Sequence, residues 1–215
     1  MRRMAVVLWV ALGVSAGCTD DNASLFISGN VAPDDDCFYS PSNALWLGGS
    51  MDVSLTNIYY AAPLYNNQLI TRQSEGPLAA DPNGIHIEGA VVELRDTSGA
   101  AIGDAFTVSS STYVPPGTGD SAGQSVGSLE LVPPAFGVML QATVAADAYT
   151  EIVASVTPFG ATTGGTEIEA REWLWPIYVC SGCLVRCATA DELMTDMGGA
   201  CFPGNNEETP VACAP

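Results

Sequence analysis

The sequence predicts an all-β protein whose C-terminal tail is held by disulfides. Between residues 50 and 179, short apolar segments alternate with clusters of Gly, Pro, Asn and Ser, and no stretch there has a convincing helical period. Five of the seven cysteines lie in the last 36 residues. We therefore expect a single two-sheet β-sandwich over residues 50–179, followed by a Cys-rich tail over residues 180–215.

Seven strands are expected in the sandwich. Residues 52–56 alternate polar and apolar side chains, as a half-buried strand does. Residues 85–96 change the parity of their apolar side chains at Gly89-Ala90, which predicts a β-bulge there. Residues 96–99 have the composition of a turn, so residues 90–109 are expected to form a hairpin. The other strands are expected at about 126–132, 137–144, 151–157 and 166–179.

This number and spacing of strands resembles the immunoglobulin-like and fibronectin-like sandwiches. The resemblance is one of architecture alone, because the Cys, Trp and Cys spacing of true immunoglobulin domains is absent. A sandwich of this type implies no particular activity, so function has to be argued from individual sites.

The tail is expected to contain one short helix and to be cross-linked to the sandwich. Residues 189–192 have the spacing of a capping box, apolar residues follow, and Gly198-Gly199 would end the helix. Cys201 and Cys213 enclose a polar loop and form a natural pair. Cys37 would then join one of three closely spaced cysteines, namely Cys180, Cys183 and Cys187. Six cysteines allow many connectivities, and the sequence does not choose among them.

The N-terminus has the parts of an export signal. Met1-Arg2-Arg3 is a basic start, and the apolar run that follows is too short to span a bilayer. Ser15-Ala16-Gly17 are small residues directly before Cys18, and this pattern resembles the lipobox of bacterial lipoproteins. The resemblance implies that residues 1–17 are removed, that Cys18 is lipidated, and that the protein is anchored to the cell envelope. The expected location is the outer membrane of a Gram-negative bacterium.

The cysteine count agrees with lipidation of Cys18. The remaining six cysteines are an even number, which in an oxidising compartment predicts three disulfides. They are Cys37, Cys180, Cys183, Cys187, Cys201 and Cys213. Residues 18–49 are polar and rich in Asp and Pro, and we expect them to form an acidic tether between the lipid anchor and the sandwich.

Charge excludes one class of partner. The chain has 24 acidic residues against 6 basic ones, all of them Arg, for a net charge of −18. After loss of Arg2 and Arg3, 24 acidic residues face 4 Arg, which gives −20. Nucleic-acid binding needs a basic surface that this chain lacks. Because 47% of the residues are hydrophobic and only 14% are charged, the sequence should fold.

Two overlapping Gly-x-Ser-x-Gly segments, centred on Ser121 and Ser125, resemble the nucleophile turn of serine hydrolases. Hydrolysis would need a His to accept the serine proton and a carboxylate to orient that His. His86 is the single histidine, and it precedes both serines, which is the wrong order for the α/β-hydrolases. It also lies too close to Ser121 in the chain for a chymotrypsin-like protease. A flexible Gly/Ser loop is the simpler interpretation.

The closely spaced Cys180, Cys183 and Cys187 have three possible uses. A Cys-x-x-Cys pair can be a redox centre, and three thiolates with a fourth ligand can bind zinc. Both uses conflict with an oxidising compartment, so structural disulfides are the favoured interpretation.

Two other patterns could bind a ligand. Asp34-Asp35-Asp36 could contribute to an irregular calcium site with Asp20 or Asp21, although a solvated acidic turn is simpler. Trp173 and Trp175 point the same way from a predicted strand and could stack on a carbohydrate, although core packing is more usual.

We therefore expect a non-enzymatic, lipid-anchored envelope protein that has a structural or protein-interaction role and needs no cofactor. Its contacts would be the membrane, through Cys18, and an envelope or extracellular protein. The alternative is a binding module for calcium or extracellular polysaccharide. A serine hydrolase is a remote alternative.

Overall fold

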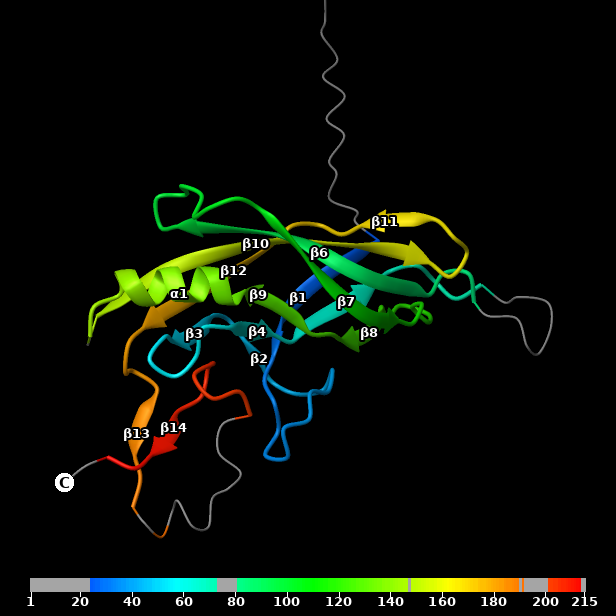
Figure 1. Ribbon diagram of the computed structural model, residues 1–215. Coiled ribbons are helices and arrows are strands. Elements are labelled where there is room, and N and C mark those ends of the chain that lie inside the picture. Colours follow the sequence, from blue (N-terminus) through cyan, green and yellow to red (C-terminus); the bar gives the residue numbers. More distant parts are fainter. Residues whose placement is uncertain (1–23, 73–80, 147, 190, 192–200, 214–215) are drawn as a thin grey trace, which may run out of the picture.

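The computed structural model describes residues 24–72, 81–146, 148–189, 191 and 201–213, and Figure 1 shows their arrangement. The export signal, Cys18 and nearly all of the expected tail helix lie outside these residues. The described part of the chain is mostly β, which confirms the all-β prediction. It contains fourteen strands in four sheets, where the sequence led us to expect seven strands in two.

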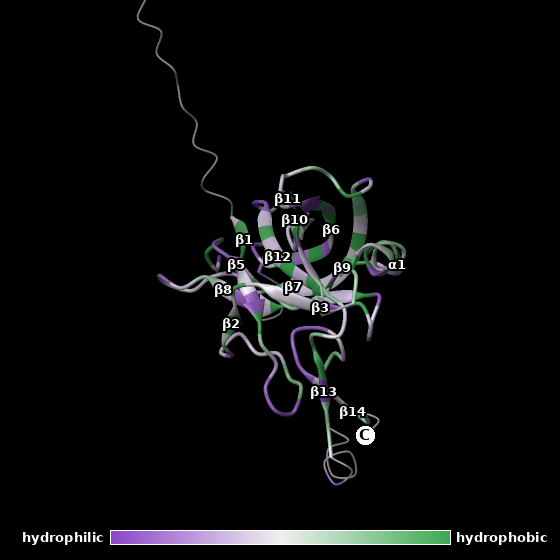
Figure 2. Cartoon of the chain, turned by 90° about the vertical axis from the view of Figure 1, so that its left-hand side faces the viewer, coloured by the Kyte–Doolittle hydropathy of each residue, from purple (hydrophilic) through white to green (hydrophobic). Residues whose placement is uncertain are grey.

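The largest sheet has six strands in the order β3-β12-β10-β6-β7, with β11 paired to β10. Its pairings are antiparallel except that between β3 and β12. The view in Figure 2 shows that this sheet is strongly curled. The strands are β3 (Gly49–Asp52), β6 (Ile85–Asp96), β7 (Phe106–Val114), β10 (Tyr149–Thr162), β11 (Glu167–Glu169) and β12 (Trp173–Cys180).

The second sheet has four strands in the order β2-β1-β5-β8, and two strand pairs complete the fold. The four strands are β1 (Leu25–Val31), β2 (Leu45–Trp46), β5 (Pro63–Asn67) and β8 (Gly123–Val126). β4 (Tyr59–Ala61) pairs with β9 (Leu129–Val132), and β13 (Val185–Cys187) pairs in parallel with β14 (Thr209–Val211).

Strand β1 lies within residues 18–49, the segment expected to be a tether. Leu25 and Val31 are fully buried, and β1 pairs with both β2 and β5. From Ser24 onward, this segment is therefore part of the folded body. The composition was misleading because β1 itself carries no charged residue and is apolar enough to be buried, while Asp34, Asp35 and Asp36 lie in the loop after it.

Strand β6 has the predicted bounds, and its bulge is where the parity of the apolar residues changes. Ile85 and Ile87 are buried before the bulge, and Val92 and Leu94 are buried after it. The register with β7 shifts between Ile87 and Gly89. The backbone is tightly packed here, since a Cβ on Gly89 would lie 2.4 Å from the Val108 carbonyl oxygen. The expected hairpin is also confirmed, because β6 turns at Asp96–Gly99 and pairs with β7.

The expected strand at 137–144 is wrong, because helix α1 spans Pro134–Thr143. Alternating apolar residues suggested a period of two, but the buried pair is Gly137 and Leu140, three residues apart on one face of a helix. Pro134 occupies the first turn, where a missing N–H costs nothing. Pro134 therefore starts a helix here.

The expected strand at 52–56 is also displaced. Strand β3 ends at Asp52, whose carboxylate accepts hydrogen bonds from the Ser54 N–H and hydroxyl. These bonds draw the chain into a turn over residues 53–55. The segment expected at 126–132 is divided between β8 and β9, the one at 151–157 lies within the longer β10, and the one at 166–179 forms β11 and β12.

All six expected cysteines form disulfides, but the pairing differs from the expected one. The bonds join Cys37 to Cys201, Cys180 to Cys183, and Cys187 to Cys213. Cys213 does not pair with Cys201 because β14 pairs with β13 and carries Cys213 toward Cys187. Cys37 reaches Cys201 because the loop after β1 and the C-terminal segment lie on the same side of the sheets (Figure 1).

Candidate functional site

A pocket of about 360 Å³ lies where the two ends of the folded chain meet the sheets. Its walls come from the loop after β1, from β2, β4, β7 and β8, and from the segment before β14. Four aromatic side chains line it, namely Tyr39, Trp46, Tyr60 and Phe202, and polar groups line the rest, including Asn30, Thr112, Asn205, Asn206 and Glu207. A pocket with aromatic walls and a few polar groups is the usual form of a small-molecule site.

Three of the aromatic rings form one continuous wall. The ring centroid of Phe202 lies 5.7 Å from that of Tyr60 and 6.2 Å from that of Tyr39. Tyr39 is two residues from Cys37, and Phe202 follows Cys201, so the disulfide between these cysteines holds both rings in place. This disulfide joins parts of the chain that are 164 residues apart in sequence.

The segment before β14 is attached to the core by a buried hydrogen-bond chain. The Trp175 indole N–H donates to the Tyr59 hydroxyl at 3.1 Å, and that hydroxyl donates to Asn206 Oδ1 at 3.0 Å. The Ser50 N–H donates to the same Asn206 oxygen at 2.8 Å. Burial raises the pKa of Tyr59 to about 12, so the phenol keeps the proton that it donates.

Gly49 leaves space for the hydrogen bonds that join Trp175, Tyr59 and Asn206. A Cβ at this position would lie 2.0 Å from the Tyr59 hydroxyl oxygen and 2.9 Å from Trp175 Nε1. Any side chain here would therefore displace the groups that position Asn206. At the neighbouring Gly48, a Cβ would make only ordinary contacts of 3.6 Å with Pro176.

Asn205 lines the pocket, but its side-chain oxygen is buried and unpaired. The residue is 5% exposed, and its side-chain N–H donates to the Ile58 carbonyl at 3.2 Å. Its Oδ1 is buried and has no hydrogen-bond partner among the described residues. An unsatisfied buried acceptor costs about 1–3 kcal/mol. This oxygen has almost no accessible surface, so we assign it no part in binding.

The ionisable groups at the pocket are acidic. Glu207 lines the pocket, and its Oε2 accepts the Cys201 N–H at 2.7 Å. Burial, and then the charge of Glu207, raise the pKa of Tyr39 to about 12. Behind the wall, the Tyr60 hydroxyl donates to Glu130 Oε2 at 3.1 Å. None of the described arginines lines the pocket.

Sequence reasoning did not find this pocket. Its aromatic residues are scattered from Tyr39 to Phe202, and no spacing rule connects them. The one local signal is that Tyr39 and Phe202 each lie within two residues of a cysteine of the Cys37–Cys201 bond, and that signal has meaning only once the pairing is known.

Asp34, Asp35 and Asp36 are exposed and form a turn. Asp34 Oδ1 accepts the N–H groups of Asp36 at 3.1 Å and Phe38 at 2.8 Å. Within the described residues, the one group of three potential metal ligands within 4.8 Å of one another is elsewhere, so these carboxylates do not converge. Asp20 and Asp21, the other expected calcium ligands, lie outside the described residues.

The two tryptophans of β12 stack on each other instead of forming an open platform. Their ring centroids are 5.1 Å apart, with an angle of 29° between the planes. Trp175 is 2% exposed and belongs to the main core, while Trp173 is half-buried against it. Core packing therefore accounts for this pair.

The structure does not bring together the residues of the serine-hydrolase alternative. His86 is exposed on β6, and its ring packs on Tyr113 with 4.9 Å between centroids. Ser121 lies in a turn with Thr118, and Ser125 lies in β8 opposite Tyr65. Among the hydrogen bonds of the described residues, none joins His86 to either serine.

The group of three potential metal ligands consists of Asp52, Cys180 and Cys183. Both sulfurs are in the disulfide, and the Asp52 carboxylate accepts four hydrogen bonds, two from Ser54 and one each from the N–H groups of Gly182 and Leu184. Burial raises the pKa of Asp52, but these hydrogen bonds lower it by more, so it lies below its ordinary value. Asp52 therefore holds the Cys180–Cys183 loop against β3.

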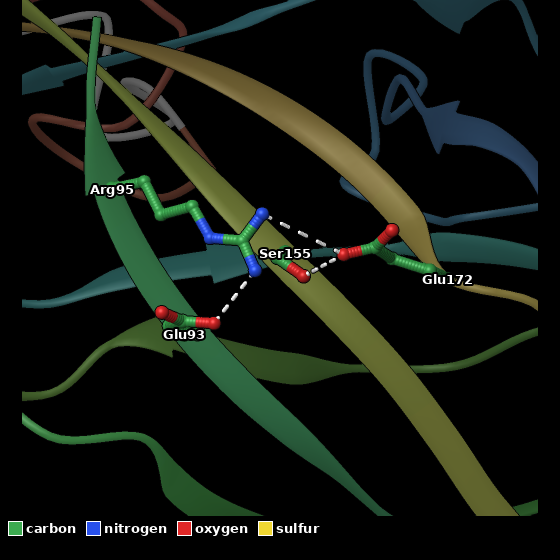
Figure 3. Close-up of polar contacts among 4 residues, drawn as sticks. All are labelled: Glu93, Arg95, Ser155 and Glu172. Atoms are coloured by element: carbon green, nitrogen blue, oxygen red, sulfur yellow. Dashed lines mark hydrogen bonds and ion pairs between the residues drawn. The ribbon is translucent and has the colours of Figure 1, made fainter. Parts of the chain in front are cut away.

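A polar network crosses the outer face of the largest sheet (Figure 3). Arg95 lies 2.7 Å from Glu93 and 4.0 Å from Glu172, and the Ser155 hydroxyl donates to Glu172. The hydrogen bond from Arg95 lowers the pKa of Glu93. Each acidic group in this network has a partner. The network therefore joins β6 and β10 to the residue that precedes β12.

Comparison with known proteins gives no relative from which a function could be transferred. No family model matches the chain, and no curated protein or solved structure matches it either. In the part of the chain that the structure describes, no helix combines the length and the apolar character needed to cross a membrane.

Proposed function

We propose that this chain is an exported, lipid-anchored binding protein that holds a short saccharide in the pocket between its two chain ends, without converting it. The observation that carries the proposal is the pairing of a continuous aromatic wall with polar groups in one pocket, among them the carboxylate of Glu207.

A saccharide suits both halves of this pocket. The C–H faces of a sugar ring pack against aromatic side chains, which offer large apolar surfaces. Its hydroxyl groups can donate to an acceptor that lines the pocket, such as the carboxylate of Glu207. The volume of about 360 Å³ is at the lower end of the range for small-molecule pockets, which suits one or a few sugar units.

Export and anchoring through Cys18 are supported by the signal-like N-terminus and by three disulfides, which form most readily in an oxidising compartment. The outer membrane of a Gram-negative bacterium is the proposed location. The separation of His86 from Ser121 and Ser125 supports a role without catalysis. The immunoglobulin-like comparison, based on seven strands, stays a prediction.

A second candidate is the protein-interaction role expected from the sequence. Leu174 and Tyr178 project from β12 and are 54% and 48% exposed, so the sheet presents apolar surface beside the polar network of Figure 3. Site-specific photo-crosslinking at Tyr178 in intact cells would test this role. A specific crosslinked partner is expected if the role is correct, and no crosslink above that of an equivalent probe at Tyr113 would contradict it.

The saccharide proposal is tested by calorimetry with defined oligosaccharides on the intact protein. Phe202→Ala and Tyr60→Ala should each weaken binding about tenfold, because each removes about 1.4 kcal/mol of ring stacking. Phe38→Ala is the matched control, since Phe38 also neighbours a cysteine of the same disulfide but is 69% exposed and lies outside the pocket wall. Binding that is unchanged by Phe202→Ala, or lost equally in Phe38→Ala, would contradict the assignment.

A further inference from the structure

The charge of the pocket restricts the ligand further. Glu207 lines the wall, and none of the ion pairs among the described residues involves it. Its neighbour Glu208 lies 3.8 Å from Arg186 and outside the pocket wall. The carboxylate of Glu207 is therefore an uncompensated negative charge at the site.

The geometry keeps this charge in place. The Cys201 N–H donates to Glu207 Oε2 at 2.7 Å, which orients the carboxylate and leaves Oε1 for another donor. The side chain is half-buried, so its charge is less screened than one in open water. The charge also acts on a neighbouring group of the pocket: after burial, it is the second cause that raises the pKa of Tyr39.

Other groups of the pocket also favour a positive charge. The faces of the Tyr39, Tyr60 and Phe202 rings carry the negative part of the aromatic quadrupole, which attracts cations. An ammonium group supplies three donors and no acceptor. A carboxylate or sulfate would instead meet Glu207, with no described arginine among the lining residues.

We infer that the pocket selects a saccharide that carries a free ammonium group, with Glu207 as the residue that recognises the charge. This inference rests on the proposed saccharide-binding function and names its substrate class. A basic amino sugar matches both the aromatic wall and the negative charge. A neutral acetylated sugar matches the aromatic wall alone, and an acidic sugar is repelled by the charge.

The test compares oligosaccharides that differ in one group. Titration calorimetry on the intact protein would use a glucosamine tetramer, the N-acetylglucosamine tetramer and a galacturonate tetramer at the same ionic strength. The free amine should bind about tenfold more tightly than the acetylated sugar, which corresponds to one partly buried charge contact. The acidic tetramer should bind more weakly than either.

Two variants assign this preference to one residue. Glu207→Gln keeps an acceptor for the Cys201 N–H but removes the charge, and it should abolish the preference for the amine. Glu208→Gln makes the same change in net charge one residue away and should leave the preference intact. Unfolding midpoints of both variants would show whether the fold is retained, and the ratio of the two sugar affinities in each variant is insensitive to a uniform loss of binding.

The outcomes separate the two proposals. If the neutral tetramer binds as well as the amine, or if Glu207→Gln and Glu208→Gln behave alike, the inference about charge is overturned while saccharide binding stands. If none of the tetramers binds, the proposed function itself is overturned.

Discussion

The Cys37–Cys201 bond should stabilise the fold much more than the Cys180–Cys183 bond. It joins residues 164 positions apart, whereas Cys180 and Cys183 are 3 positions apart. On the chain-entropy model, closing a loop of the longer size stabilises the native state by about 5 kcal/mol, and closing the shorter one by about 2 kcal/mol. The short loop is also held by the hydrogen bonds of Asp52, so it should keep its shape without its disulfide.

Two double variants test this difference in urea unfolding experiments that are monitored by tryptophan fluorescence. Cys37→Ser with Cys201→Ser should lower the free energy of unfolding by about 4–5 kcal/mol and raise the dependence on urea, because the unfolded chain then exposes more surface. Cys180→Ser with Cys183→Ser should lower it by about 2 kcal/mol or less. The first variant should also lose saccharide binding, since its bond holds Tyr39 beside Phe202.

The reasoning would be refuted if the variant without Cys180 and Cys183 were destabilised as much as the one without Cys37 and Cys201. It would also be refuted if the latter bound saccharide with unchanged affinity while folded, because the pocket would then not depend on the bond.

Three further predictions concern single residues. Asp52→Asn should cost about 1–3 kcal/mol at neutral pH, because one partly buried N–H, that of Leu184 or of Gly182, loses its acceptor. The pKa of Asp52 is depressed in the folded protein, so its contribution is present above pH 3.8 and is lost as the pH falls further. Thermal melts between pH 2 and 7 should therefore show the wild type approaching the variant in acid, and a constant difference would contradict this. Gly49→Ala should destabilise the protein and weaken saccharide binding, whereas Gly48→Ala should change the melting temperature little; equal effects would argue against the crowding at Tyr59. Gly137→Ala would stabilise an isolated helix by about 1 kcal/mol. In this protein it should be destabilising, because the new Cβ would lie 1.9 Å from the backbone oxygen of Asn57. A raised melting temperature would refute the close packing of α1.

Local patterns predicted the elements whose structure is governed by local rules. The parity of the apolar residues in 85–96 located both β6 and its bulge, because side chains of a strand alternate between its two faces wherever the strand lies in the fold. Helix α1 was missed because its apolar residues fit a period of two as well as one helical face, and only its packing distinguishes the two.

The sequence by itself determined that the chain is mostly β, that it is strongly acidic, and that six cysteines are available to form three disulfides. Only the tertiary structure decided which cysteines pair, that β1 belongs to the folded body, and that four dispersed aromatic residues line one pocket. The physical reason is distance along the chain. Alternation and residue counts depend on neighbouring residues, whereas the pocket depends on a contact between Cys37 and Cys201, which the register of the sheets and the path of the tail bring together.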